Sequence, residues 1–255
     1  MQETKSRRSF LISSTTGAAL LLGCKSSETS AAASNASSSP TTVTTTDAGA
    51  PNSKEESEPE VTATEDLMRE HGVIRRALVV YREAAGRLRI APKTVPIDAL
   101  QKTAKLLRSF AEDYHERQLE EAHLFPAVKK AGGPAAALVD TLVAQHNRGR
   151  EITEYVIALT AASIGAKNDV LAKTLEGFAR MYEAHAAIED TIVFPAWKKT
   201  MSAKELDAIG DTFEDIEHKT FGKDGFDDAV EQITAIEHAF GLELSQLTPL
   251  PPPKS

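Results

Sequence analysis

The sequence of 255 residues has a single cysteine, Cys24, and a single tryptophan. A chain with one thiol cannot form an internal disulfide or hold a metal between several cysteines, so disulfide scaffolds and cysteine-ligated zinc are excluded. Basic residues are also in short supply, with 29 lysines and arginines against 37 aspartates and glutamates and a formal net charge of −8. Because an acidic surface repels phosphate backbones, we expect no nucleic acid among the partners.

The N-terminal apolar stretch, residues 10–23, is too short and too rich in serine, threonine and glycine for a membrane-spanning helix of ~20 residues. Residues 1–23 have instead the pattern of an export signal. The string "RRSFL" at 7–11 resembles a bacterial twin-arginine signal, and "LLGC" at 21–24 resembles a lipobox. The resemblance implies cleavage before Cys24, a lipid on Cys24, and an exported, membrane-anchored lipoprotein on the periplasmic or cell-surface side.

Two segments contain almost nothing to bury. Residues 24–64 are rich in serine, threonine and alanine and predict a disordered tether between the lipid anchor and the folded part. Residues 245–255 include three consecutive prolines, which cannot continue a helix, and predict an open tail. The folded part is therefore expected between residues 65 and 244.

Within that part, apolar residues recur at three- and four-residue steps, with little alternation, which predicts an all-α fold. We expect an up-down-up-down four-helix bundle over 65–200 and a C-terminal helical extension over 201–244. Capping boxes are predicted at Thr62 with Glu65 and at Ser202 with Glu205. Pro96 and Pro134 mark the expected starts of the second and third helices.

Each of the four predicted helices places one histidine on its apolar face, and two of the helices add a glutamate about one turn later. These six residues are His71, His115, Glu120, His146, His185 and Glu189. Buried polar groups without partners are costly, and side chains at one level of a bundle converge, so the six could meet around two metal ions. Imidazole with carboxylate suits iron or manganese.

Two stretches of sequence repeat this pattern with different spacing. "YHERQLEEAHLFP" at 114–126 separates His115 from Glu120 by five residues, whereas "YEAHAAIEDTIVFP" at 182–195 separates His185 from Glu189 by four. Residues four apart lie about 40° from each other around an α-helix, and residues five apart about 140°. A one-residue π-bulge between positions 117 and 120 would turn both side chains inward. The alternative is that Glu116, four before Glu120, replaces His115 as a metal ligand.

These stretches, with "EHGVIRR" at 70–76 and "AQHNRGREIT" at 144–153, resemble the hemerythrin-like, or HHE cation-binding, family of non-haem diiron four-helix bundles. The resemblance implies two iron ions, with the four histidines as terminal ligands and the two glutamates as bridges. Hemerythrin has a second histidine one turn after its third-helix ligand, and this position is Arg150 here. That departure predicts a less symmetric site, with one iron short of a ligand.

The resemblance further implies a function. We expect a tethered protein whose diiron site binds oxygen, nitric oxide or peroxide, as a carrier or a sensor, and the histidine-rich set favours this reading. The alternative is a diiron oxidoreductase or an iron-handling protein, which would break down peroxide, oxidise ferrous iron or repair iron centres. Solvent access beside Arg150 would favour the alternative, so enzymatic activity stays open.

Overall fold

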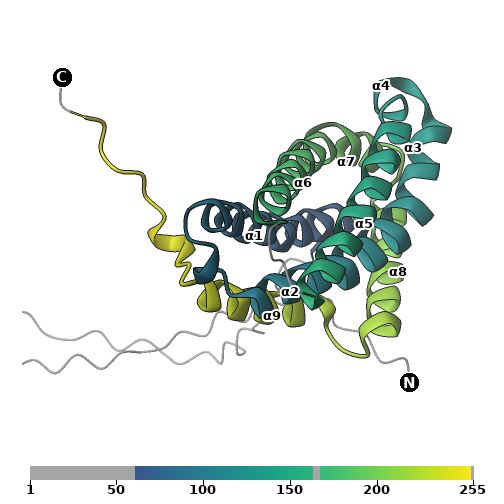
Figure 1. The fold of residues 1–255 in the computed structure, drawn as a ribbon. Helices are drawn as coiled ribbons and strands as arrows, with labels where there is room; N and C mark the ends of the chain where they lie inside the picture. The colour runs from purple at the N-terminus through teal and green to yellow at the C-terminus, as the bar shows by residue number, and fades with distance from the viewer. Residues whose placement is uncertain (1–60, 163–166, 254–255) are drawn as a thin grey trace, which may run out of the picture. The chain divides into compact units, whose positions relative to one another are not determined.

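The structure, a computed structural model, describes residues 61–162 and 167–253, and its long elements there are helices (Figure 1). The prediction of an all-α fold is therefore confirmed. The predicted export signal, Cys24 and most of the predicted tether lie outside the described residues. Within the described part, no helix is both long enough and apolar enough to cross a membrane.

Four long rods form the body of this fold (Figure 1). The first is α1 (Ala63–Ile90), and the third is α5 (Val139–Ala161). The second rod is composite, and consists of α2 (Ile97–Leu106), the π-helix η2 (Leu107–Leu124) and α3 (Phe125–Ala131). The fourth is built in the same way from α6 (Asn168–Ile188), the π-helix η4 (Glu189–Val193) and α7 (Phe194–Lys198). Two short helices, η1 (Pro92–Thr94) and α4 (Gly133–Ala136), lie in the connections.

Ion pairs between α1 and the fourth rod show that these two rods are antiparallel. The pairs are Arg75 with Asp190, Arg82 with Glu183 and Arg89 with Glu176. Residue numbers rise along one rod as they fall along the other, as expected for neighbours in an up-down-up-down bundle. Apolar side chains of α1, including Leu67, Ile74 and Leu78, are buried in the core.

The helix starts predicted at Thr62, Pro96 and Ser202 agree with the structure, whereas Pro134 lies in the short α4 and the third long helix begins later, at Val139. The Thr62 side chain accepts a hydrogen bond from the Glu65 N–H at 3.3 Å, which is one half of the expected capping box. At Ser202 both halves form, because the Glu205 carboxylate also accepts from the Ser202 N–H at 2.8 Å. Each such cap satisfies backbone donors that the first helical turn leaves free.

The π-helical structure is more extensive than the sequence predicted. We expected one extra residue between positions 117 and 120, whereas π-helix covers Leu107–Leu124 and recurs at Glu189–Val193. Both segments end at a Phe-Pro pair, where the Phe125 N–H donates to the Glu120 carbonyl and the Phe194 N–H to the Glu189 carbonyl. Because proline lacks an N–H and clashes with the carbonyl four residues earlier in an α-helix, a wider turn suits this position.

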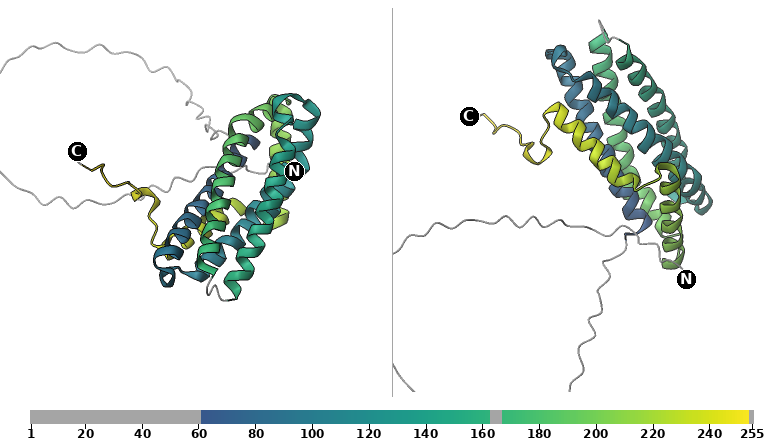
Figure 2. Two further views of the ribbon diagram at one scale, coloured as in Figure 1. Left: turned by 45° about the horizontal axis from the view of Figure 1, so that its top comes forward. Right: turned by 90° about the horizontal axis from the view of Figure 1, so that it is seen from below.

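The C-terminal extension lies on the outside of the rods (Figure 2). It consists of α8 (Ala203–Phe221), α9 (Gly225–Phe240) and the short η5 (Leu244–Gln246). Helix α9 packs against α1 and α2, and α8 packs against η2. Arg76 of α1 anchors α9 through hydrogen bonds of 2.8 Å to Glu237 and to Thr234. Beyond η5 the chain leaves the helices, and Leu250 is exposed (Figure 1).

Candidate metal centre

The structure brings all six sequence-predicted side chains together inside the bundle. His71 comes from α1, His115 and Glu120 from η2, His146 from α5, His185 from α6 and Glu189 from η4. Each is at most 3% exposed. We refer to these six residues as the His/Glu centre. Four different rods are needed to form it, so the centre exists only when the whole bundle is folded.

The imidazoles form two pairs, and the carboxylates lie between them. The ring centroids are 4.8 Å apart in the His71–His115 pair and 4.7 Å apart in the His146–His185 pair. Glu120 places one oxygen 3.4 Å from His115 Nε2 and the other 3.4 Å from His146 Nε2. Glu189 Oε2 lies 2.9 Å from His185 Nε2 and 3.5 Å from His71 Nε2. Each carboxylate therefore faces one imidazole of each pair.

The opposite nitrogen of every imidazole, Nδ1, has its own hydrogen-bond partner outside the centre. These outer partners are Asp190 for His71 at 2.8 Å, Glu70 for His115 at 2.6 Å, Glu121 for His146 at 2.8 Å and Gln145 for His185 at 2.9 Å. A donor bond from Nδ1 fixes the tautomer and the ring orientation, and leaves the Nε2 lone pair facing inward. All four rings are thus oriented in the same sense.

Sequence reasoning missed these outer partners, although a signal for them was present. Each one is the sequence neighbour of a residue of the centre: Glu70 precedes His71, Glu121 follows Glu120, Gln145 precedes His146 and Asp190 follows Glu189. Each nevertheless serves an imidazole on a different rod. Two adjacent residues of one helix therefore contribute to the centre in different ways.

The centre is poorly satisfied by protein groups alone. All four carboxylate oxygens of Glu120 and Glu189, and His115 Nε2, are buried and lack a hydrogen bond of normal geometry from any group in residues 61–162 and 167–253. His146 Nε2 and His185 Nε2 face each other at 3.0 Å. Burying so many unsatisfied acceptors is costly, whereas cations between them would satisfy all of them. The donor set therefore fits divalent metal ions.

Histidines and carboxylates of the centre shift each other's pKa values in opposite directions. Burial lowers the pKa of His115, but Glu120 and Glu70 outweigh it and hold this pKa well above its ordinary value. The pKa values of His71 and His146 are raised in the same way, against burial, by the acidic groups that face them. Conversely, burial raises the pKa of Glu189, yet the imidazoles of His185 and His71 lower it overall. The raised pKa values of His71, His115 and His146 mean that a metal ion would compete with protons for these three imidazoles.

The proposed alternative ligand, Glu116, is held by other groups. One oxygen accepts from the Tyr182 hydroxyl at 2.7 Å and the other from Arg150 at 3.0 Å. Tyr182 reaches this position only because residue 149 is glycine, since a Cβ there would lie 1.9 Å from the tyrosine oxygen. Glu116 also lies near Glu121 and His146 in a group that could hold an ion, but the Arg150 guanidinium already bridges the two carboxylates.

Arg150 occupies the position where the resembled pattern has a second histidine. It is 9% exposed, and its guanidinium contacts Glu116, Glu121 and Asn147 rather than the inner face of the centre. The four imidazoles divide equally, two on each side of the carboxylates. The imidazoles are therefore equal in number on the two sides, but the groups that could hold an ion have four donors on the His146–His185 side and three on the His71–His115 side. That one ion is short of a ligand stays a prediction.

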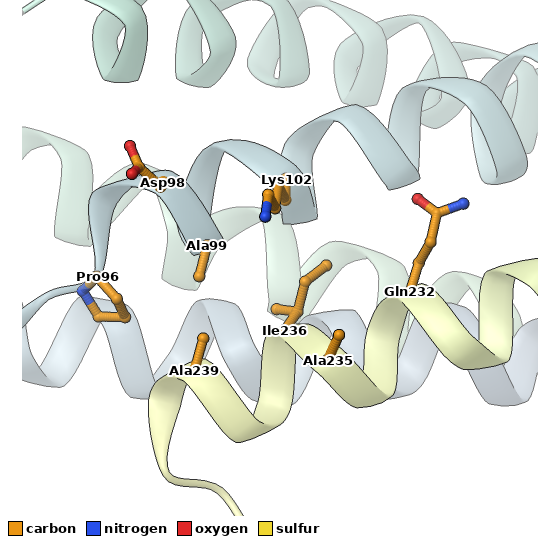
Figure 3. Close-up of a pocket in the computed structure, with 8 residues that line it drawn as sticks. All are labelled: Pro96, Asp98, Ala99, Lys102, Gln232, Ala235, Ile236 and Ala239. Atoms are coloured by element: carbon orange, nitrogen blue, oxygen red, sulfur yellow. The ribbon is translucent and has the colours of Figure 1, made fainter.

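A surface pocket of about 430 Å³ lies elsewhere, between α2 and α9 (Figure 3). Pro96, Ala99 and Ile236 are among its lining residues, with Lys102 and Gln232 at the same groove. No residue of the His/Glu centre or of its outer partners lines this pocket. The pocket and the centre are therefore separate features of the bundle.

Comparison with known proteins agrees with the geometry. The family model "Hemerythrin HHE cation binding domain" matches residues 62–197, which include every residue of the centre. Uncharacterized proteins of Mycobacterium bovis and of Mycobacterium tuberculosis H37Rv are each 44% identical to this chain over 205 residues, which is 79% of this chain and 79% of each relative. No solved structure matches the chain significantly. The chain therefore belongs to the hemerythrin HHE cation-binding domain family.

Proposed function

We propose that this chain is a non-haem diiron protein that binds a small ligand, namely oxygen, nitric oxide or peroxide, as a carrier or a sensor. The observation that carries the proposal is the His/Glu centre, in which four inward Nε2 atoms surround two buried carboxylates whose oxygens lack a hydrogen bond of normal geometry within the described residues. Nitrogen and oxygen donors without thiolate suit iron, and manganese is the next candidate.

The geometry supports a role for each protein group of the centre. His71 and His115 would hold one ion, His146 and His185 the other, and Glu120 and Glu189 would bridge them. When bound, a pair of iron ions would supply Lewis acidity and redox capacity for the uptake of a small ligand. The outer partners keep each imidazole in position before and after loading, so that little reorganisation accompanies binding.

Two phenylalanines shield the centre from water. Phe194 stacks on His71 with ring centroids 5.3 Å apart, and Phe125 stacks on His146 at 5.6 Å. Both phenylalanine side chains are at most 2% exposed. An apolar cover on each imidazole pair limits access to small molecules and lowers the local dielectric, which strengthens the electrostatic interactions inside.

A diiron oxidoreductase or iron-handling role is the second candidate. The observation in its favour is the number of carboxylates near the centre, because Glu70, Glu121 and Asp190 join the two inner glutamates. Carboxylate-rich surroundings stabilise the higher charge of ferric iron and so suit oxidative turnover.

One set of measurements separates these possibilities. The full chain is purified from iron-replete cells and its metal content, its optical spectrum and its consumption of oxygen and peroxide are measured. We expect two iron ions per chain and one stoichiometric spectral change on ligand addition, without turnover. Sustained consumption would favour the oxidoreductase. A colourless, metal-free protein would contradict both, and His146→Ala, which removes one inward nitrogen, provides the matched metal-depleted control.

The location is a further part of the proposal and rests on the sequence alone. We propose that the export signal directs the folded, loaded domain across the membrane and that a lipid on Cys24 retains it there. Cys24→Ala should shift the protein from the membrane fraction to the soluble fraction, and Arg7→Lys with Arg8→Lys should retain it inside the cell. An unchanged distribution of both variants would contradict the tether.

A further inference from the structure

A second group of buried polar side chains lies close to the His/Glu centre but outside it. Glu112 of η2, Thr153 of α5 and Tyr81 of α1 are each at most 1% exposed. Glu112 has an ion pair with Arg108, but both of its carboxylate oxygens and the hydroxyl oxygens of Thr153 and Tyr81 lack a hydrogen bond of normal geometry within residues 61–162 and 167–253. Folded proteins satisfy nearly all such atoms with protein groups or with ordered water, so these four atoms require an explanation.

The register between η2 and α5 places Glu112 opposite Thr153. Three contacts define it: His146 with Glu121, Arg150 with Glu116 and Arg108 with Glu154. Residue numbers fall along η2 as they rise along α5, so the two helices are antiparallel. Glu112 lies midway between the η2 residues of the last two contacts, and Thr153 lies between the α5 residues of the same contacts. The two side chains therefore share one level of the bundle.

Tyr81 approaches the same level from α1. Its ring packs edge-on against Phe178 at 5.3 Å, and Phe178 in turn contacts Tyr182 at 4.5 Å. Burial, and then the nearby charge of Glu112, raises the pKa of the Tyr81 hydroxyl. Burial likewise raises the pKa of Glu112 to about 7, although Thr153 and Arg108 act in the opposite direction. Tyr81 and Thr153 are thus both close enough to Glu112 to interact with it electrostatically.

The group has an outer end and an inner end. On the outside, Arg108 is 25% exposed, and its Nε forms an ion pair with Glu112 at 3.1 Å. On the inside, Glu116 lies one turn further along η2, where it accepts from Tyr182 at 2.7 Å. Glu112 therefore lies between the partly exposed Arg108 and Glu116, which borders the His/Glu centre.

We propose that Glu112, Thr153 and Tyr81 line an internal binding site for water, placed between Arg108 at the surface and the Glu116–Tyr182 hydrogen bond beside the centre. Water fits because it donates to the carboxylate and accepts from either hydroxyl, which satisfies donors and acceptors together. A cation is disfavoured by Arg108 and Arg150, which both act on the Glu112 carboxyl. An apolar gas would leave all the polar atoms unsatisfied. The site requires no metal, so it stands independently of the proposed function.

A crystal structure of the full chain tests the site directly. We expect density for at least one water within hydrogen-bond distance of the Glu112 carboxylate and of the Thr153 or Tyr81 hydroxyl. Direct hydrogen bonds of Glu112 with those hydroxyls, without water between them, would overturn the proposal.

Stability gives a second test, because removing an unsatisfied buried hydroxyl stabilises a protein whereas removing one that binds ordered water destabilises it. Thr153→Val in the metal-free protein should lower the Tm by about 2–4 °C. Thr103→Val is the matched control: Thr103 is equally buried, but its hydroxyl donates to the Ala99 carbonyl of its own helix at 2.8 Å. We expect the control to change the Tm by less than about 1 °C.

The second variant, Tyr81→Phe, should also lower the Tm and should remove the water from the crystal density. A rise in Tm, or no change, in both Thr153→Val and Tyr81→Phe would show that the group is simply unsatisfied, and the proposal would be wrong. Because both variants are measured without metal, a protein that fails to bind iron would contradict the proposed function and leave this test unaffected.

Discussion

The two stretches at 114–126 and 182–195 reach the same geometry by different backbone routes. In each, a histidine and a glutamate face the centre, and the following phenylalanine stacks on a histidine of another rod. The separation between histidine and glutamate is five residues in the first stretch and four in the second. Correspondingly, π-helix covers 18 residues around the first pair and only 5 residues, starting at the glutamate, in the second.

The difference shows how helix type compensates for spacing. Hydrogen bonds in a π-helix join residues five apart, so such residues lie one above the other, as residues four apart do in an α-helix. His115 and Glu120 both lie within η2, whereas His185 belongs to α6 and Glu189 begins η4. The extra residue of the first stretch therefore does not break the resemblance, because the wider helix returns both side chains to the inner face.

The largest effects should come from removing either inner carboxylate. Glu120→Ala and Glu189→Ala should each cost at least one of two metal ions per chain, because each carboxylate faces an imidazole of both pairs. Metal content by mass spectrometry is the measurement, with the exposed Glu183→Ala as control. If Glu189→Ala kept both ions while Glu120→Ala lost both, the first stretch alone would form the site.

A smaller effect is expected from the outer partners, which differ between the stretches. His115 has the carboxylate of Glu70, whereas His185 has the neutral amide of Gln145. Glu70→Ala should weaken metal binding by roughly 10–100-fold, and Gln145→Ala should lie at the lower end of that range. Competition titrations with a chelator would measure both. Equal losses would mean that the charge of the outer partner is irrelevant.

The stability of the metal-free protein should depend on pH through both stretches, with His115 of the first acting at high pH and Glu189 of the second at low pH. The pKa of His115 is raised above the ordinary 6.5, so its contribution to stability is complete below pH 6.5 and is lost as pH rises through the folded value. The pKa of Glu189 is lowered from 4.5, so its contribution is present above pH 4.5 and is lost as pH falls. The Tm should therefore be highest between about pH 4.5 and 6.5.

Two substitutions isolate these contributions in thermal scans across pH. His115→Gln should flatten the decline above pH 6.5, and Glu189→Gln should flatten the decline on the acid side. In the loaded protein the alkaline decline should disappear, since metal ions bind the deprotonated imidazoles. A loaded protein that loses stability above pH 6.5 as steeply as the metal-free one would contradict this assignment.

The smallest effect is expected from making the two spacings equal. Arg117 is exposed and forms an ion pair with Asp113, four residues earlier, at 2.8 Å. Deleting Arg117 reduces the separation of His115 and Glu120 to four, and an α-helical turn would then direct both inward. Metal content should be retained, with a change in Tm of a few degrees at most. Complete loss of metal would contradict this expectation and show that an α-helical turn cannot replace the π-helix at this place.

Much of this architecture was accessible from periodicity. Apolar residues such as Leu67, Ile74 and Leu78 recur on one helical face, and burial follows that face closely. The caps at Thr62 and Ser202 were also predictable, because a serine or threonine followed three residues later by glutamate is the sequence signature of a capping box. The family resemblance proposed from the doubled stretches is confirmed by the match over 62–197.

The outer partners and the extent of π-helix were not predicted, and the reasons are physical. Glu70, Glu121 and Asp190 look like ordinary polar neighbours, because only the packing of another rod reveals which imidazole each one meets. The second π segment, at Glu189–Val193, leaves no irregular spacing between His185 and Glu189, so periodicity gave no sign of it. Phe-Pro after each glutamate was the available signal.

The sequence adjacency of inner residues and outer partners has a consequence for how the centre assembles. Rotating any single rod by a few degrees displaces one or two residues of the centre and, at the same time, the hydrogen-bond acceptor of an imidazole on another rod. Partial arrangements with half of the imidazoles in place therefore lose contacts of both kinds. If the centre holds two ions, as proposed, they should bind cooperatively rather than one after the other.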